Sequence, residues 1–452
     1  MGSKEVFALF EFDHTISSGY SGEQPSIHRR PSRQAEHEQE HAPLPRADGG
    51  RDAWLFLLGS FFIEALIWGF PYSFGLFQEY YTTHAPFSNE PSGIAVIGTL
   101  ALGIMYLGAP FTFALLQRFP HHRRRFAFAG LVITSTALIG SSFATRVWHL
   151  ILTQGVLYAV GGSILYFPTI IFLDEWFIRR KGLAYGVMWA GTGVSGVCIP
   201  FIMNWGLSRY SFSTMLRVWS IVLILLAGPL LLFVKPRTPV SPTSCRRPIS
   251  LAFIKTSTFW ALQTGNILQG LGFFMPNIYL PSYARAIGLS SIAGTVTITL
   301  FNTMSVFGQV IQGALSDKLH VTTVILMSTI GATLSVFLLW GLSASLPLLC
   351  IFSIMYGLSA GGFSSTWTGA TQEIRKRDDN AELGMVFGLL AAGRGIGSVV
   401  SGPLSEALLS DQPWRGEATL GYGTGYGPLI VFTGITAMCG GFSWVGRRAG
   451  WV

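Results

Sequence analysis

The stretch GLAYGVMWAGTGVSG at residues 182–196 decides the fold, because the chain repeats it as GMVFGLLAAGRGIGS at residues 384–398. The two stretches align without a gap at an offset of 202, and each is apolar and follows a charged loop. Five glycine or alanine positions coincide, and Tyr185 matches Phe387. Further upstream, ALLQRF from Ala114 is echoed by ALSDKL from Ala314 at an offset of 200. A chain of 452 residues that repeats at nearly half its length is typical of a duplicated membrane bundle.

The composition agrees with a membrane protein. Half of the residues are hydrophobic, only 12% are charged, and the mean hydropathy is +0.47. The 53 glycines suit transmembrane packing, in which small residues allow helix backbones to approach closely. The first 51 residues are too polar for a cleavable signal peptide, so we expect the first helix to direct insertion.

Runs of about 20 apolar residues predict an all-α integral membrane protein with twelve transmembrane helices. We place them at residues 53–77, 93–116, 126–145, 147–173, 182–204, 214–234, 257–281, 291–315, 321–343, 346–371, 384–409 and 425–446. The predicted organisation is a disordered N-tail, a six-helix bundle, a Pro/Ser-rich basic linker, a second pseudo-symmetric six-helix bundle and a short C-tail. Their ranges are 1–52, 53–234, 235–256, 257–446 and 447–452.

The distribution of basic residues predicts the orientation. If both termini are cytoplasmic, the tails and inner loops hold 24 of the 30 lysines and arginines, and the outer loops hold 5. Positive charge concentrates on the cytoplasmic side of membrane proteins, so this split favours cytoplasmic termini. We expect a multi-pass protein of the plasma membrane.

Several other classes are excluded by position. The GxGxxG pattern at Gly191–Gly196 lies inside a predicted span with no strand before it, so it indicates helix packing and not a dinucleotide site. The basic run at 121–125 sets topology and contacts anionic lipid, and we expect no nucleic-acid partner. The four scattered cysteines and the absence of histidine from mid-span positions predict no metal site. No catalytic constellation is present, so we predict a protein that is not an enzyme and needs no cofactor.

Two ionisable residues fall near the middle of predicted spans. Glu64 lies 11 residues into the first span and Arg394 lies 10 residues into the eleventh, which places both about 15 Å deep. Charge inside a bilayer is costly and usually lines a pathway. We therefore predict that Arg394 binds an anionic or carbonyl-rich substrate and that Glu64 carries a coupling proton. The alternatives are a structural ion pair between them, or a protonated Glu64 bonded to a neighbouring helix.

Polar and aromatic residues on five spans complete the predicted substrate site. Asn302, Ser305, Gln309 and Gln312 share one face of the eighth span, and Gln263, Asn266, Gly270 and Asn277 share one face of the seventh. These faces point either to a wet cavity or to partner helices. Aromatic candidates for stacking on a planar substrate are Tyr72, Tyr158, Tyr166, Tyr356 and Trp367.

The duplicated plan of twelve spans and the sequence around these residues resemble the major facilitator superfamily. The run WFIRRKGLAYGVMWAG at 176–191 is similar to the fifth-helix signature of the monocarboxylate transporter-like family, and Asp52-Ala53-Trp54 is similar to part of its first-helix motif. The runs at 69–81 and 393–408 resemble its fungal branch. The resemblance covers about residues 52–446 and implies two six-helix bundles, a central site, alternating access and secondary transport without ATP. By the same resemblance, loop residues Arg179, Arg180, Lys181, Asp317 and Lys318 stabilise conformational states.

The chain departs from the family at substrate positions. Animal monocarboxylate carriers have a lysine in the first helix and an aspartate–arginine pair in the eighth, whereas the matching residues here are Tyr72, Ser305 and Gln309. The first inter-helix loop carries Gln117 in place of the usual aspartate, while Asp317 is retained in the second copy. The resemblance therefore does not extend to proton-linked lactate or pyruvate transport.

The sequence predicts a secondary active transporter of a small organic solute, such as an organic anion, a monocarboxylate-like compound or a secondary metabolite. A proton-antiport efflux pump shares every span and needs a titrating carboxylate, for which Glu64 is the candidate. A nutrient sensor with a transporter fold is the third alternative, although only about six residues follow the last span. The expected partners are a small-molecule substrate, the lipid bilayer and protons.

Overall fold

The computed structural model describes residues 44–89, 93–238, 250–410 and 414–452, and residues 45–452 form one compact unit. Every regular element in these ranges is a helix. The predicted N-tail up to residue 43 and residues 239–249 of the predicted linker lie outside the described residues.

The first half of the chain forms six helical segments, some of them broken. Their α-helices are α2 (Arg51–Tyr72), α3 (Phe74–Thr83), α4 (Ile94–Leu107), α5 (Ala109–Arg118), α6 (Arg123–Ser141), α7 (Val147–Leu150), α8 (Tyr158–Trp176), α9 (Lys181–Arg209) and α10 (Phe212–Phe233). A π-helix, η3 (Ile151–Leu157), joins α7 to α8, and short 3-10 turns η1 (Phe87–Asn89) and η2 (Pro120–His122) lie in loops. The bend of 46° between α4 and α5 falls at Gly108, where Pro110 removes a backbone donor and crowds the preceding turn.

The second half forms six corresponding segments. Their α-helices are α11 (Ser257–Ala286), α12 (Ser291–Ser316), α13 (Val321–Leu334), α14 (Leu346–Ala360), α15 (Trp367–Arg377), α16 (Leu383–Leu409), α17 (Gly427–Cys439) and α18 (Phe442–Arg448). The π-helix η5 (Ser335–Trp340) extends α13, the 3-10 turn η6 (Phe363–Thr366) joins α14 to α15, and η4 (Ala252–Lys255) and η7 (Leu420–Thr424) precede α11 and α17. Thr256 caps α11 and Ser290 caps α12, each accepting a backbone N–H with its hydroxyl.

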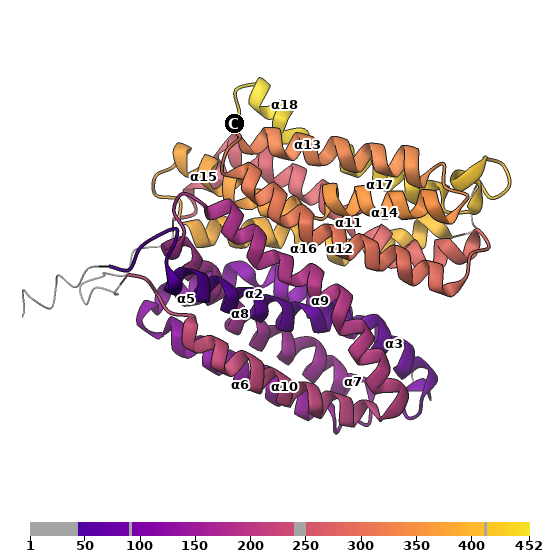
Figure 1. Ribbon diagram of the computed structural model, residues 1–452, viewed down its shortest axis with the longest axis horizontal. Coiled ribbons are helices and arrows are strands. Elements are labelled where there is room, and N and C mark those ends of the chain that lie inside the picture. The colour runs from indigo at the N-terminus through magenta and orange to yellow at the C-terminus, as the bar shows by residue number, and fades with distance from the viewer. Residues whose placement is uncertain (1–43, 90–92, 239–249, 411–413) are drawn as a thin grey trace, which may run out of the picture. The chain divides into compact units, whose positions relative to one another are not determined.

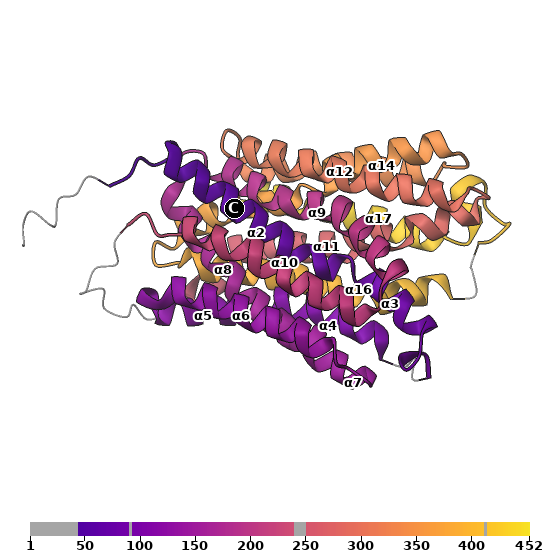
Figure 2. The ribbon, with the colours of Figure 1, turned by 60° about the horizontal axis from the view of Figure 1, so that its bottom comes forward.

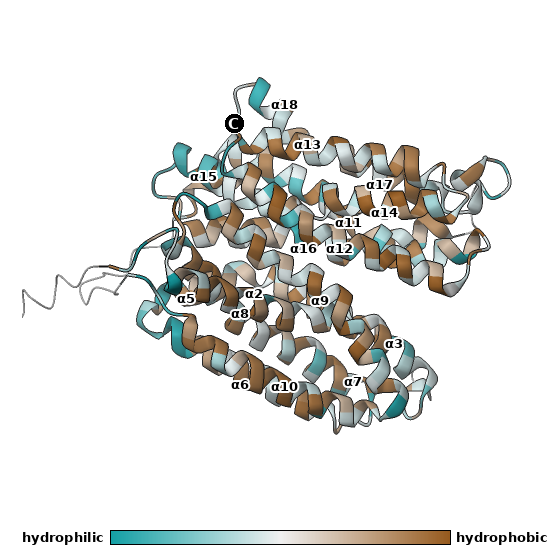
Figure 3. Ribbon diagram, viewed as in Figure 1, coloured by the Kyte–Doolittle hydropathy of each residue, from teal (hydrophilic) through white to brown (hydrophobic). Residues whose placement is uncertain are grey.

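Each of the twelve predicted spans coincides with one helical segment. Among the described residues eight segments are long and apolar enough to cross a membrane, and the bent pair α4–α5 makes a ninth. The other three segments, α6, α11 and α12, are not among these nine, although each is at least 18 residues long. Hydrophobic residues follow the long helices and hydrophilic residues gather towards their ends (Figure 3).

The helices of the two halves form two groups that meet along two seams (Figures 1 and 2). At one seam α9 packs along α12, and at the other α16 packs along α4 and α5. The start of the described chain, in indigo, and the C-terminus lie at the same end of the helices, which we call the terminal end, and the opposite end is the far end (Figure 1).

The repeated glycines of the sequence lie in these two seams. A side chain at Gly186 would collide with the backbone oxygen of Gln309 on α12, and one at Gly388 would meet the backbone of Pro110 on α5. The close approach of these backbones explains why both copies keep glycine there.

Candidate functional site

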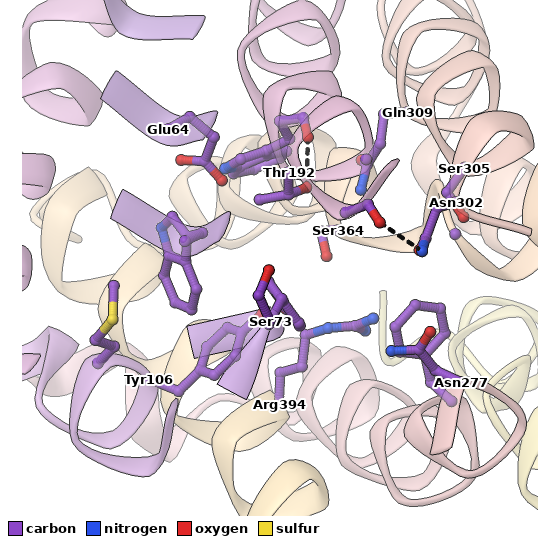
Figure 4. A pocket seen from close by; sticks show the side chains of 18 of the residues that line it. Glu64, Ser73, Tyr106, Thr192, Asn277, Asn302, Ser305, Gln309, Ser364 and Arg394 are labelled. Atoms are coloured by element: carbon purple, nitrogen blue, oxygen red, sulfur yellow. Dashed lines mark hydrogen bonds between the residues drawn. The ribbon is translucent and has the colours of Figure 1, made fainter. Parts of the chain in front are cut away.

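A central cavity of about 400 Å³ lies between the two halves. Its walls come from α2, α3, α4, α8 and α9 of the first half and from α11, α12, η6, α15 and α16 of the second. Polar residues from both halves point into it, as Figure 4 shows for Glu64, Thr192, Asn302 and Arg394. Thr192 and Arg394 occupy equivalent positions in the repeat, so the two copies present different chemistry to one space.

Arg394 is the buried cation of this cavity. Its side chain on α16 is 2% exposed, and its Nη1 donates a 2.7 Å hydrogen bond to Oε1 of Gln269 on α11. The guanidinium carbon lies 4.3 Å from the ring centre of Phe273, a favourable cation–π distance. Gln269 and Phe273 hold the guanidinium in place. The planar guanidinium has further N–H donors that can form hydrogen bonds to an anion.

Glu64 is the buried acid, on α2. It is 2% exposed, and its Oε2 atom has no hydrogen-bond partner within the described chain. Tyr166 is its polar neighbour. Among the described ion pairs, none joins Glu64 to Arg394. The structural ion pair considered from the sequence is therefore absent from this conformation.

Two aromatic pairs, one of two tyrosines and one of a tyrosine and a tryptophan, line the cavity beside these charges. The hydroxyls of Tyr72 and Tyr106 lie 3.0 Å apart, which joins α2 to α4. The Tyr166 hydroxyl accepts a 2.9 Å hydrogen bond from the indole nitrogen of Trp189. Both pairs present ring faces and a polar edge, a combination that suits planar organic molecules.

The polar face of α12 faces the cavity. Asn302, Ser305 and Gln309 all line it, with Asn302 donating to the Gly196 oxygen and Gln309 accepting from Ser365. Gln312 departs from this pattern, because its amide donates to the Leu358 and Ser359 oxygens.

The polar face of α11 behaves differently. Asn277 lines the cavity, but Asn266 does not. The Asn266 amide donates to the Leu390 oxygen at 2.7 Å and accepts from the Trp367 indole at 3.0 Å. Asn266 therefore ties α11 to α16 and α15 in this conformation, and its role in substrate binding stays a prediction. Trp367 does line the cavity, whereas the other aromatic candidates Tyr158 and Tyr356 are buried in the helix packing.

The predicted loop residues gather at the terminal end, around the start of α9. The Asp317 carboxylate accepts N–H bonds from Gly182 at 2.6 Å and from Leu183 at 2.9 Å. Burial raises the pKa of Asp317, against the lowering effect of these two N–H groups. This contact closes the α9–α12 seam with a charge placed at a helix N-terminus.

The other loop residues have separate roles in the structure. Lys181 pairs with Asp174 at 2.8 Å, while Arg179, Arg180 and Lys318 are exposed. The N–H groups of residues 178–180 bind a partner that the sequence analysis missed, the Asp48 carboxylate, at 2.9–3.0 Å. Burial alone would raise the pKa of Asp48, but these N–H groups outweigh it and lower that pKa below its usual value.

An aromatic floor separates the central cavity from the terminal end. Phe387 stacks on Tyr185 with ring centres 5.7 Å apart and on Trp189 at 5.5 Å, and Trp367 meets it edge-on at 5.4 Å. The lining residues of the cavity extend in the other direction to Leu76, Pro200 and Pro281 on the far side. The cavity is thus closed towards the terminal end and extends towards the far end.

A family model described as Major Facilitator Superfamily matches residues 53–401. The chain belongs to the Major Facilitator Superfamily. The predictions of an all-helical membrane fold and of a transporter are thereby confirmed, and the chain is a multi-pass membrane transporter. The finer prediction of a monocarboxylate transporter-like branch stays a prediction.

Fungal transporters resemble this superfamily member over most of its length. It is 28% identical over 379 residues to the MFS-type transporter pynF of Aspergillus niger, covering 83% of this chain and 86% of the relative. It is 27% identical over 390 residues to the agnestins efflux protein AgnL12 of Paecilomyces divaricatus, covering 86% and 85%. It is 24% identical over 408 residues to the aspyridones efflux protein apdF of Emericella nidulans, covering 89% and 78%.

Proposed function

We propose that this transporter exports a small organic acid with a planar body, such as a secondary metabolite, in exchange for protons. The names of two relatives, efflux proteins for aspyridones and agnestins, support export. In this proposal the terminal end faces the cytoplasm, the membrane is the plasma membrane, and the described conformation faces outward. The concentration of basic residues in the tails and inner loops supports that orientation.

Arg394 carries the proposal of an acidic substrate. It is a buried guanidinium on the wall of an aromatic cavity, and its described polar partners are neutral: the amide of Gln269 and the hydroxyl of Tyr106. A guanidinium stays charged at physiological pH and binds carboxylates and phosphates through two parallel N–H bonds. A cationic fork without a carboxylate partner, beside stacked rings, favours a planar anion over a neutral solute.

A matched pair of ligands tests this preference. We expect the purified protein to bind 2-naphthoate more tightly than the neutral isostere 2-naphthamide, measured by isothermal titration calorimetry. One charge-assisted hydrogen bond contributes about 1.5–3 kcal/mol, which corresponds to about a 10- to 150-fold difference in Kd. Equal affinity for the two ligands would refute an anion site.

Substitutions of Arg394 separate a substrate site from a structural strut. Arg394→Lys keeps the charge but loses the planar fork, so it should fold normally and lose most of the preference for 2-naphthoate. Arg394→Gln should lose the preference entirely and also fold. If both variants misfold and Glu64→Gln with Arg394→Gln restores expression, the two residues form a strut in another conformation and the substrate role is wrong.

Glu64 is the proposed proton carrier. Its buried carboxylate borders the cavity, and the unpartnered Oε2 atom leaves it able to take up a proton without breaking a bond in this conformation. Glu64→Gln should abolish transport against a gradient in proteoliposomes while keeping exchange of labelled 2-naphthoate for unlabelled 2-naphthoate. An unchanged pH dependence of transport in this variant would remove Glu64 from the coupling step.

A further inference from the structure

A second cavity of about 610 Å³ lies at the terminal end, along the seam of α5 and α16, and we call it the vestibule. Its lining includes the buried apolar residues Phe113, Ile170 and Phe387. Its rim is charged and includes Arg123, Arg375 and Asp379. Such a pocket suits an amphipathic molecule whose apolar body lies inside and whose polar group stays near the rim.

Phe387 is the one described side chain that lines both the vestibule and the central cavity. It is 5% exposed, and its ring packs between Tyr185 and Trp189 on one side and Phe113 on the other. A change of its side-chain rotamer would therefore join the two spaces. Arg394 lies seven residues further along α16, two turns away and on the same face, so a molecule passing Phe387 next meets Arg394.

The two seams are closed at the terminal end by unlike groups. In the α9–α12 seam the Asp317 carboxylate accepts two N–H groups. Its equivalent in the other copy is Gln117, which lies against Gly384 at the start of α16. The Oε1 atom of Gln117 is buried and has no hydrogen-bond partner in the described chain. A neutral amide whose carbonyl oxygen has no partner holds a seam less firmly than a charge-assisted contact, so the α5–α16 seam is the easier one to open.

We propose that the vestibule is a loading site for an amphipathic organic molecule, and that Phe387 is the gate through which this molecule enters the central cavity along the α5–α16 seam. This inference rests on the proposed export function, because it assigns entry to the terminal end. The gate and the seam are, however, testable without any transported substrate.

Thiol accessibility tests the gate. Ala391 lines the central cavity one turn beyond Phe387, so Ala391→Cys is placed in a full-length background with Cys198, Cys245, Cys350 and Cys439 replaced by serine. A membrane-impermeant methanethiosulfonate is applied to the terminal side of sealed vesicles. Phe387→Ala should raise the labelling rate at least tenfold. Phe301→Ala, the same change elsewhere on the cavity wall, should leave the rate unchanged.

Equal labelling rates in Phe387→Ala and Phe301→Ala would overturn the gate. Labelling from the far side serves as the check of folding, because both variants should keep it. If Phe387→Ala fails this check, it is replaced by Phe387→Leu, which removes less volume. A labelling rate of Phe387→Leu equal to that of Phe301→Ala would again overturn the gate. Gln117→Asp should supply the missing carboxylate and slow terminal-side labelling several-fold, and an unchanged or faster rate would overturn the assignment of the weaker seam.

Protection by a ligand tests the loading site itself. Ile171 lines the vestibule, and 2-naphthoate should slow labelling of Ile171→Cys from the terminal side. The protection should persist in Arg394→Gln, which removes the central anion site. Protection that disappears in Arg394→Gln would overturn the vestibule as a separate site. If 2-naphthoate protects Ile171→Cys but shows no binding that depends on Arg394, the proposed function is wrong, and the result for the gate is unaffected.

Discussion

A close backbone approach in the α9–α12 seam gives a sharp prediction for Gly186. The Cβ of an alanine there would collide with the Gln309 oxygen and lie 3.1 Å from the carbonyl carbon of Gln309 and the Cα of Val310. These are backbone atoms, so they cannot rotate away as a side chain would. Gly186→Ala must therefore push α9 and α12 apart at the terminal end.

The size of the effect follows from the cost of overpacking. An added methyl group in a tight interior costs about 1–3 kcal/mol. This contact exists in the conformation closed at the terminal end and is lost when the seam separates. The equilibrium constant between the closed and the open conformation should therefore shift towards the open one by about 5- to 150-fold. Gly402 on α16 is the matched control, because a methyl group there meets nothing within 4 Å. Gly402→Ala should leave the equilibrium unchanged and raise the stability of the helix by up to about 1 kcal/mol.

Pulsed electron paramagnetic resonance measures this equilibrium. Spin labels at the exposed positions Arg125 on α6 and Arg377 on α15 report the separation of the two halves at the terminal end. Gly186→Ala should increase the population at longer distances, and Gly402→Ala should give the wild-type distribution. Identical distributions in the two variants would refute the argument that backbone contact closes this seam.

Three further predictions concern other contacts. Asp48→Ala should speed hydrogen exchange of the backbone amides of residues 178–180 by about 10- to 30-fold, because their N–H groups lose a charged acceptor. Since N–H bonding lowers the pKa of Asp48 below 3.8, the protection of these amides in the wild-type protein should hold at neutral pH and weaken only as the pH falls below that value. Gln269→Glu should weaken calorimetric binding of 2-naphthoate at least tenfold and leave that of 2-naphthamide unchanged, because a carboxylate next to Arg394 competes with the ligand. A reporter fused after Val452 should appear in the cytoplasm, and an extracellular reporter would overturn the proposed orientation.

The sequence predicted the buried charges and the fold because both depend on local signals. A charged residue in an apolar run identifies Glu64 and Arg394 without any knowledge of their neighbours. The repeat at an offset of 202 predicts two equivalent halves, and Tyr185 and Phe387, matched in the alignment, contact each other in the structure.

Other site features depend on how each helix is rotated about its axis, which spacing does not specify. The polar faces of α11 and α12 have the same periodicity, yet Asn302 faces the cavity while Asn266 bonds to α16. Contacts distant in sequence were also missed. Gln269 contacts Arg394 across 125 residues and Asp48 contacts Arg179 across 131, and neither residue has a local pattern that indicates its partner. The Asp48-Gly49-Gly50 turn before the first helix was the one available signal.

The contact between Tyr185 and Phe387 bears on how a duplicated transporter acquires a site. A half-length ancestor that paired with a second copy of itself would have placed the same aromatic residue on both sides of this contact, as every two-fold symmetric dimer does. Such a dimer could not hold one cation in its central space, because any arginine at the position of Thr192 and Arg394 would occur twice and repel its copy. Gene fusion removes that constraint. The single arginine at one of the two equivalent positions is therefore a specificity that a symmetric dimer of identical halves could not have, whereas the aromatic contact beside it is one that such a dimer could make.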